Sequence, residues 1–145
     1  MTPLLCDSGP LIASSNSKDR EHLRVVQFLA GWRGKLLVPE PVLGETCNFL
    51  RNNVRDGAAK EVQFLRAVIQ AGDFEVVDPT DEDRRRSTEL AEQLVTGPAG
   101  YVDSMVVAMA ERLKVADVAT LDFKLIGMMS PVCRLRPLRW VLQET

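Results

Sequence analysis

The sequence predicts an α/β protein in which a central parallel sheet of short strands is flanked by helices. Four short apolar segments recur along the chain, and segments whose apolar residues recur at helical spacing separate them. Strands that alternate with helices in this way build parallel sheets with both faces covered. The 145 residues contain no repeats, low-complexity tracts or linker-like stretches, so residues 1–145 are expected to form a single domain.

The expected strands are short apolar runs bounded by turn residues, a pattern typical of strands buried within a sheet. They span residues 3–6, 35–39, 74–78 and 117–122. After Pro131 the pattern is weaker, and either residues 133–135 or residues 138–142 could add a strand at the edge of the sheet. The sheet is therefore expected to contain four to five strands.

Two helices are expected between the first and second strands. Ser8 can cap a short helix through Ile12, because serine is a preferred N-cap residue and Pro10 is tolerated in a first turn. A longer helix is expected over residues 18–32, ending near Gly31. Its apolar residues at helical spacing are Leu23, Val26, Leu29 and Ala30.

Two further helices are expected between the second and third strands. Pro39 and Pro41 open the first, and the second covers residues 58–71 and is closed by Gly72. In the first, the residues that share an apolar face are Val42, Thr46, Phe49 and Leu50. In the second, the residues expected to face inward are Val62, Leu65, Val68 and Ile69.

The last two expected helices lie between the third and fourth strands. Thr80 followed by Asp83 resembles a capping box, so a helix is expected to begin there and to continue to about Val95. The GPAG segment at 97–100 breaks the pattern, and the strongest amphipathic helix follows it. Its apolar face consists of Val102, Met105, Val106, Met109 and Leu113.

The composition excludes several classes of protein. A net charge of −2 means that the molecule as a whole does not attract nucleic acid, so such binding would need a local basic patch. The run Arg84–Arg86 is expected on a solvated helix face. No signal peptide and no apolar run of about 18 residues are present, so no membrane span is expected. The three cysteines lack metal-site spacing and are interpreted as small buried residues of a cytoplasmic protein.

Four acidic residues are expected at one edge of the sheet. Asp7 directly follows the first strand, and Asp122 ends the fourth. Glu45 and Asp103 lie early in helices that begin near the same edge. Ligands of open α/β sheets bind beyond the carboxyl ends of the strands, so these side chains could converge on one site.

Converging carboxylates raise each other's pKa, and the usual remedy is a hard divalent cation. Mg²⁺ and Mn²⁺ prefer oxygen ligands, and such a site can activate water and stabilise charge on a phosphodiester. The hypothesis from the residues is a metal-dependent phosphodiesterase. Placement alone leaves the alternative that these acids only cap turns or complement helix dipoles.

Four segments resemble, in order, the motifs of the PIN-domain ribonucleases: LLCDSGPLIA, VPEPVLGETCNFL, YVDSMVVAMAERL and VATLD. The resemblance covers nearly the whole chain. The small single-domain size of the chain looks most like that of the toxin half of bacterial VapBC-type toxin–antitoxin pairs. The resemblance implies a three-layer α/β/α sandwich. The sequence departs from many relatives after the fourth motif, because TLDFKLIGMMSP carries no further acid until Glu144.

The resemblance implies that the chain would be an endoribonuclease with an acidic pocket for Mg²⁺ or Mn²⁺. Asp7 and Asp103 would be the first-choice metal ligands. Glu45 and Asp122 would complete the catalytic set by binding metal or positioning the attacking water. Ser8 and Thr120 match small hydroxyl positions that support the acids. The resemblance also implies an RNA substrate, a cognate antitoxin and a homodimer.

Two other classes remain open from the sequence. A phosphatase with Asp7 as nucleophile would also place an acid after the first strand. The haloacid-dehalogenase-like pattern expects an aspartate two residues later, where this chain has Gly9. The other alternative is a PIN-like binding module that has lost its activity, although all four acidic positions are filled.

Overall fold

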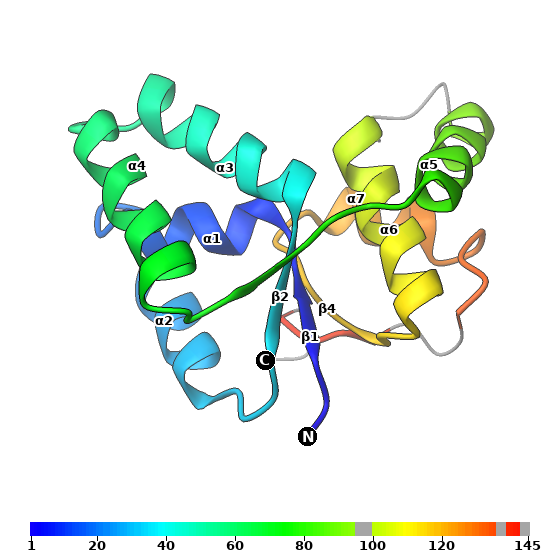
Figure 1. Cartoon of the computed structure of the whole chain (residues 1–145), viewed down its shortest axis with the longest axis horizontal. Helices are drawn as coiled ribbons and strands as arrows, with labels where there is room; N and C mark the ends of the chain where they lie inside the picture. Colours follow the sequence, from blue (N-terminus) through cyan, green and yellow to red (C-terminus); the bar gives the residue numbers. More distant parts are fainter. Residues whose placement is uncertain (95–99, 136–138, 143–145) are drawn as a thin grey trace.

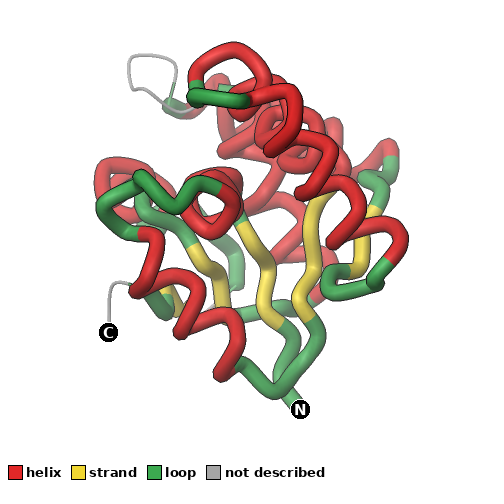
Figure 2. Tube along the Cα trace, turned by 90° about the vertical axis from the view of Figure 1, so that its left-hand side faces the viewer, coloured by secondary structure: helices red, strands yellow, loops and turns green. Residues whose placement is uncertain are grey.

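A computed structural model describes residues 1–94, 100–135 and 139–142 of the chain. Five parallel strands form one sheet in the order β3-β2-β1-β4-β5. The sheet lies at the centre of the molecule with helices around it (Figures 1 and 2). The strands are β1 Leu4–Cys6, β2 Leu36–Pro39, β3 Glu75–Val77, β4 Asp117–Ala119 and β5 Arg139–Trp140. The predicted parallel sheet of four to five short strands is confirmed.

Helices cover both faces of the sheet, so the predicted three-layer α/β/α sandwich is also confirmed. Helices α1 to α4 lie on one side and α5 to α7 on the other (Figure 1). On the first side are α1 Ser8–Ser15, α2 His22–Gly31, α3 Glu40–Asn53, α4 Gly57–Leu65 and the π-helix η1 Arg66–Gln70. On the second side are α5 Asp81–Gln93, α6 Tyr101–Leu113 and α7 Phe123–Met129.

The direction of the chain through the sheet reverses between β1 and β4. From β1 the connections run outward through β2 to β3, whereas β4 leads outward to β5 in the opposite direction. The helices that leave these two neighbouring strands therefore cover opposite faces (Figure 1). Such a switch point opens a crevice beyond the carboxyl ends of the strands. Asp7 follows β1 there, and Asp122 lies three residues after β4.

The core lies around β1 and α6. All three residues of β1 are fully buried, which explains why the strand reads as a continuous apolar run. Helix α6 buries every residue from Ser104 to Ala110. Each large apolar side chain buried in this way stabilises the fold by roughly 1.5–3 kcal/mol. This burial holds Asp7 and Asp103, at the ends of two well-packed elements, in defined positions.

Several predicted helix details are wrong. Asp7, not Ser8, is the N-cap of α1, and its carboxylate accepts a hydrogen bond from the Ser8 backbone N–H. The helix expected over 18–32 begins only at His22, because the chain turns at Asp19 through two backbone hydrogen bonds. Helix α7 was not predicted.

Some apolar residues of four helices, α2, α3, α4 and η1, face differently from the sequence pattern. Phe49, Val62 and Ile69 are 41%, 42% and 62% exposed, although Phe49 was placed on a shared apolar face and the other two were expected inward. In α4, Phe64 takes the buried position instead. In α2, Val25 and Leu29 face the core and Leu23 and Val26 do not. The neighbouring helices decide which apolar residues are buried, because α2 packs chiefly on α1 and α4 packs chiefly on α3.

Other predictions hold. The capping box of Thr80 and Asp83 is present, and Gly72 closes its helix with a φ of 71°. Within the described part of the tail, a strand forms at Arg139–Trp140 and none at 133–135. The predicted continuation of α5 to Val95 and most of the GPAG break lie outside the described residues. Among the helices that are described, none has the length and apolar character of a membrane span.

Candidate functional site

Asp7 lies at the floor of the switch-point crevice. Its backbone N–H donates to the Ala119 carbonyl at 2.9 Å, which ties the end of β1 to the end of β4. Its side chain is only 4% exposed, and its two carboxylate oxygens accept from the Ser8 N–H and the Thr120 hydroxyl, each at 2.9 Å. Burial raises the pKa of Asp7, although these two hydrogen bonds lower it in part. The nearby charges of Glu45 and Asp122 raise it further.

Glu45 reaches the same place from α3. It lies on the second turn of the helix, which begins directly where β2 ends. The Ser8 hydroxyl donates a hydrogen bond to its Oε1 atom, so Ser8 connects the start of α1 to α3. Glu45 itself is exposed, and its carboxylate faces the crevice that Asp7 closes from below.

Asp103 enters from the opposite side of the sheet, in the first turn of α6. Its half-buried position raises its pKa to about 6, first through desolvation and then through repulsion from Asp7, Asp122 and Glu45. A hydrogen bond from the Gly100 backbone only partly offsets these effects. A carboxylate whose pKa is raised by three others lies within electrostatic reach of all of them.

Thr120 and Asp122 complete the site after β4. The buried Thr120 hydroxyl donates to Asp7 and accepts from the Asp122 N–H at 3.1 Å, so it links the two acids. Asp122 Oδ1 accepts from the Leu125 N–H at 3.1 Å and caps α7. One carboxylate therefore starts a helix and also borders the crevice.

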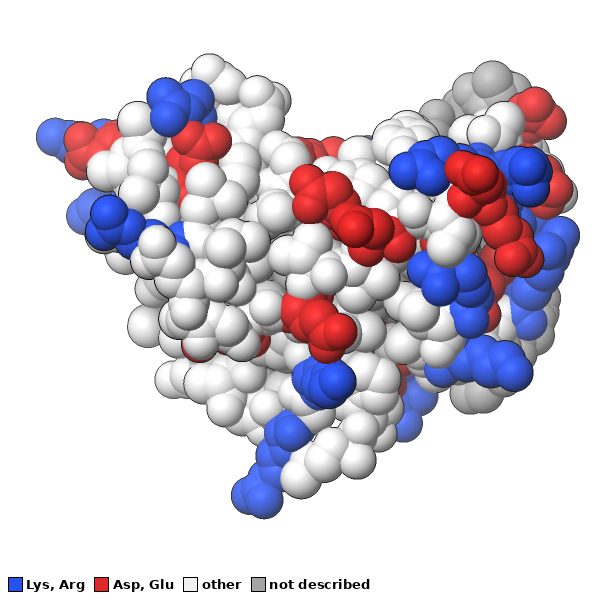
Figure 3. Space-filling view, viewed as in Figure 1, with Lys and Arg blue, Asp and Glu red and all other residues white. Residues whose placement is uncertain are grey.

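The structure brings all six predicted residues into one pocket: Asp7, Ser8, Glu45, Asp103, Thr120 and Asp122. Seen as in Figure 1, the upper outline of the molecule is hollowed between the α3 side and the α6 side, where acidic atoms are visible (Figure 3). Four lining residues were missed from the sequence: Gly9, Leu121, Phe123 and Lys124. Their signal was position, because each lies within two residues of a predicted site residue in the chain.

The pocket suits a hard divalent cation. Its charged donors are carboxylates, and within the described chain no Lys or Arg forms an ion pair with any of the four. No three described His, Cys, Asp or Glu side chains are gathered closely enough to hold an ion together. Mg²⁺, however, commonly takes one or two carboxylates and keeps several waters. Asp7 and Asp103, from opposite faces of the sheet, could supply such a pair.

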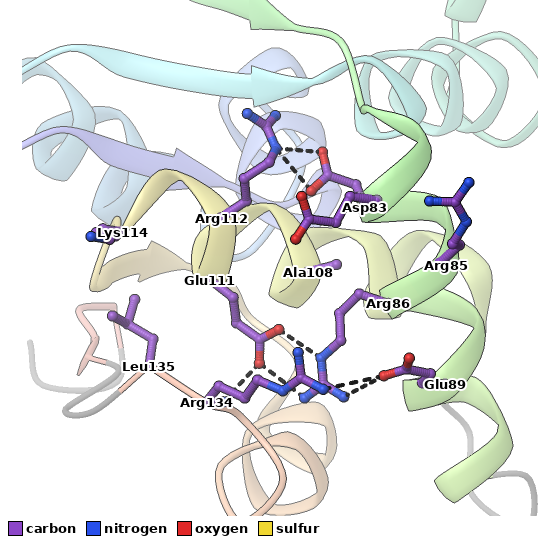
Figure 4. Close-up of a pocket in the computed structure, with 11 residues that line it drawn as sticks. Asp83, Arg85, Arg86, Glu89, Ala108, Glu111, Arg112, Lys114, Arg134 and Leu135 are labelled. Atoms are coloured by element: carbon purple, nitrogen blue, oxygen red, sulfur yellow. Dashed lines mark hydrogen bonds and ion pairs between the residues drawn. The ribbon is translucent and has the colours of Figure 1, made fainter.

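A second pocket lies between α5, α6 and the segment Cys133–Leu135, and ion pairs occupy it (Figure 4). Arg86 donates to both carboxylate oxygens of Glu111, at 2.7 and 3.1 Å, and to the Val132 carbonyl at 3.0 Å. Arg112 donates to Asp83, whose side chain is 1% exposed.

The expectation of a solvated face for the whole run Arg84–Arg86 is therefore wrong for Arg86, which is buried. Its hydrogen bond to Glu111 raises the pKa of Arg86. Burial alone would raise the pKa of Glu111, but hydrogen bonds from Arg86 and from the Arg134 backbone lower it. This paired network has the character of a structural clasp between α5 and α6.

Comparison with solved structures supports the fold. VapC20 of Mycobacterium tuberculosis, described as a sarcin–ricin loop cleaving toxin, matches with a TM-score of 0.77 and 18% identity, covering 86% of this chain and 93% of that one. A toxin–antitoxin complex from Klebsiella pneumoniae matches with a TM-score of 0.61 and 18% identity, covering 86% and 90%. VapBC2 of Rickettsia felis, bound to a DNA fragment from its promoter, matches with a TM-score of 0.61 and 15% identity, covering 87% and 92%.

Sequence comparison adds the family. No curated protein matches the sequence. The model of the PIN domain, in contrast, matches residues 4–127, which include all four acids of the pocket. The resemblance drawn from the four motifs is thus confirmed, and the chain belongs to the PIN domain family.

Proposed function

We propose that this protein is a Mg²⁺- or Mn²⁺-dependent endoribonuclease that acts as the toxin of a type II toxin–antitoxin pair. The observation that carries the proposal is the convergence of four carboxylates from four separate segments on one pocket at the switch point of the sheet. Burial and, after it, repulsion from the other three carboxylates raise the pKa of Asp103 to about 6. A fold tolerates such a cluster most readily when a bound cation compensates it.

In this proposal, Asp7 and Asp103 hold the metal. When bound, the ion supplies Lewis-acid stabilisation of phosphodiester charge and lowers the pKa of a bound water. The Ser8 N–H and the Thr120 hydroxyl fix the Asp7 carboxylate and keep it in one orientation. Such outer contacts typically change metal affinity or activity by about 10–100-fold when they are removed.

Glu45 and Asp122 are the remaining catalytic acids of the proposal. Each lies at the rim and is exposed, so each can reach a water or a substrate oxygen. Ser8 holds Glu45 by a hydrogen bond, and the α7 cap holds Asp122. Hydrolysis needs no covalent protein intermediate, because water is the nucleophile and these groups orient it and receive its proton.

The proposed partners are an RNA substrate, a cognate antitoxin and a second copy of the chain. The Klebsiella and Rickettsia structures of similar fold are toxin–antitoxin assemblies, which supports an antitoxin here. All three cysteines are free, which supports a reducing compartment such as the cytoplasm. The PIN family match includes Asp7 and disfavours the haloacid-dehalogenase-like alternative, in which that residue is a nucleophile.

The test is cleavage mapping of total cellular RNA. The wild-type chain is incubated with Mg²⁺, with Mn²⁺ and with a chelator, and the Asp7→Ala variant is treated in parallel. We expect discrete cleavage sites that need both the metal and Asp7. Cleavage that persists in the chelator and in Asp7→Ala would contradict the proposal. Absence of cleavage in every arm would favour the alternative of an inactive binding module.

A further inference from the structure

Phe123 and Lys124 line the acidic pocket, and neither belongs to the acids or to the hydroxyls that support them. They follow Asp122 directly, at the start of α7. Among the described lining residues, Phe123 is the only aromatic side chain and Lys124 is the only cation. Two adjacent residues therefore supply the two interactions that carboxylates cannot provide.

Phe123 is 55% exposed although its helix has a well-buried face. That face is taken by Leu125 and Met129, which are one turn apart and have at most 2% exposure. Phe123 therefore adds little to the core, and its ring lies at the mouth of a polar pocket. Single exposed apolar residues are ordinary, but a flat ring beside a proposed phosphodiester site offers a surface on which a nucleic-acid base can stack.

Lys124 is exposed, and it makes no ion pair with any residue in the described part of the chain. The other charged side chains that line the pocket are acids, which repel a polyanionic strand. An unpaired ammonium group at the rim lowers this repulsion for one phosphate. The overall charge of −2 gives no such help, so the local cation matters more.

We propose that Phe123 and Lys124 form a nucleotide subsite at the rim of the pocket. The ring of Phe123 stacks on an unpaired base next to the scissile phosphate, and the Lys124 ammonium binds a neighbouring phosphate. The subsite rests on the proposed ribonuclease function and specifies its substrate class. It selects single-stranded or looped RNA, because the bases of a duplex are stacked on each other and have no free face.

The test measures RNA binding apart from cleavage. In an Asp7→Asn background with Mg²⁺, fluorescence anisotropy follows a labelled single-stranded oligoribonucleotide of mixed sequence and the same strand in a duplex. Phe123→Ala is expected to weaken binding of the single strand by roughly 5–100-fold and to leave binding of the duplex unchanged. Phe123→Trp should retain single-strand binding, because its ring can also stack on a base. Lys124→Ala is expected to reduce the salt dependence of log Kd by about 0.7, the value of one phosphate contact on a single strand.

Leu23→Ala is the matched control, because Leu23 is a large apolar residue with 72% exposure on α2 that does not line the pocket. It should leave binding unchanged. Single-strand affinity that is equal in Phe123→Ala and the control would overturn the subsite and leave the ring as a surface for protein contact. Cleavage by the wild-type chain is scored separately. If Phe123→Ala weakens binding but the wild-type chain cleaves no RNA, the subsite is supported and the ribonuclease function is contradicted. If the wild-type chain cleaves RNA but Phe123→Ala binds as well as the control, the ribonuclease function is supported and the subsite is contradicted.

Discussion

Without metal, the acidic pocket should destabilise the fold, and Asp103→Asn should relieve part of that cost. The substitution keeps the shape of the side chain and removes one of four mutually repelling charges. Asp103 is the best choice because desolvation, Asp7, Asp122 and Glu45 all disfavour its charged form. We therefore expect the variant to be more stable than wild type at neutral pH in a chelator.

The size of the effect follows from the pKa of Asp103, which rises from 3.8 to about 6. Each unit of change in a pKa corresponds to about 1.4 kcal/mol, so the charged Asp103 side chain costs the fold at most about 3 kcal/mol. The side chain is only half-buried, so solvent screening reduces this to about 1–2 kcal/mol. For a chain of this size, the midpoint of thermal unfolding should rise by roughly 3–6 °C.

The pH dependence gives the prediction its sign. A carboxyl whose pKa is raised in the folded state contributes stability that is present below the ordinary value of 3.8 and is lost as the pH rises through about 6. The gap between Asp103→Asn and wild type should therefore open between these pH values and stay constant above them. Differential scanning calorimetry in a chelator measures it, with the exposed Glu92→Gln on α5 as control. A variant that is less stable than wild type at pH 7.5, or a gap that does not change with pH, would refute the reasoning.

Three other predictions concern the same structure. Arg86→Met leaves the Glu111 carboxylate, which is 9% exposed, without its guanidinium partner and should cost about 3 kcal/mol in urea unfolding. Arg86→Met combined with Glu111→Met should cost less, and a double variant that costs at least as much would contradict the paired network. Thr120→Val removes the hydroxyl that holds Asp7 and should lower the cleavage rate by about 10–100-fold with unchanged secondary structure in circular dichroism. Saturating Mg²⁺ should raise the unfolding midpoint of wild type and raise that of Asp103→Asn by less, because the variant lacks one proposed ligand.

Much of the fold follows from local pattern. Strand β1 was predictable because a fully buried parallel strand reads as a short apolar run. The meeting of Asp7 and Asp122 followed from their places after two strands of one parallel sheet. The capping box at Thr80 is likewise a local signal, since both of its hydrogen bonds span three residues.

The rest depends on packing between distant segments. Helix α2 has more apolar residues than its buried face holds, and it packs chiefly on α1 with Val25 and Leu29 turned inward. Asp7 and Ser8 are both good caps, and the extended backbone of Asp7 as it leaves β1 decides between them. Arg86 and Glu111 lie 25 residues apart, and no periodicity in the sequence relates them.

The central claim is that the four acids form a metal-dependent RNA-cleaving site. Its most direct test is the single-turnover cleavage rate of one mapped RNA substrate, measured while Mg²⁺ is titrated into wild type, Asp7→Asn and Glu92→Gln. The proposal predicts a saturable rise in rate for wild type and Glu92→Gln, and a loss of roughly 100-fold or more for Asp7→Asn. A rate that is independent of Mg²⁺, or equal in wild type and Asp7→Asn, would contradict it.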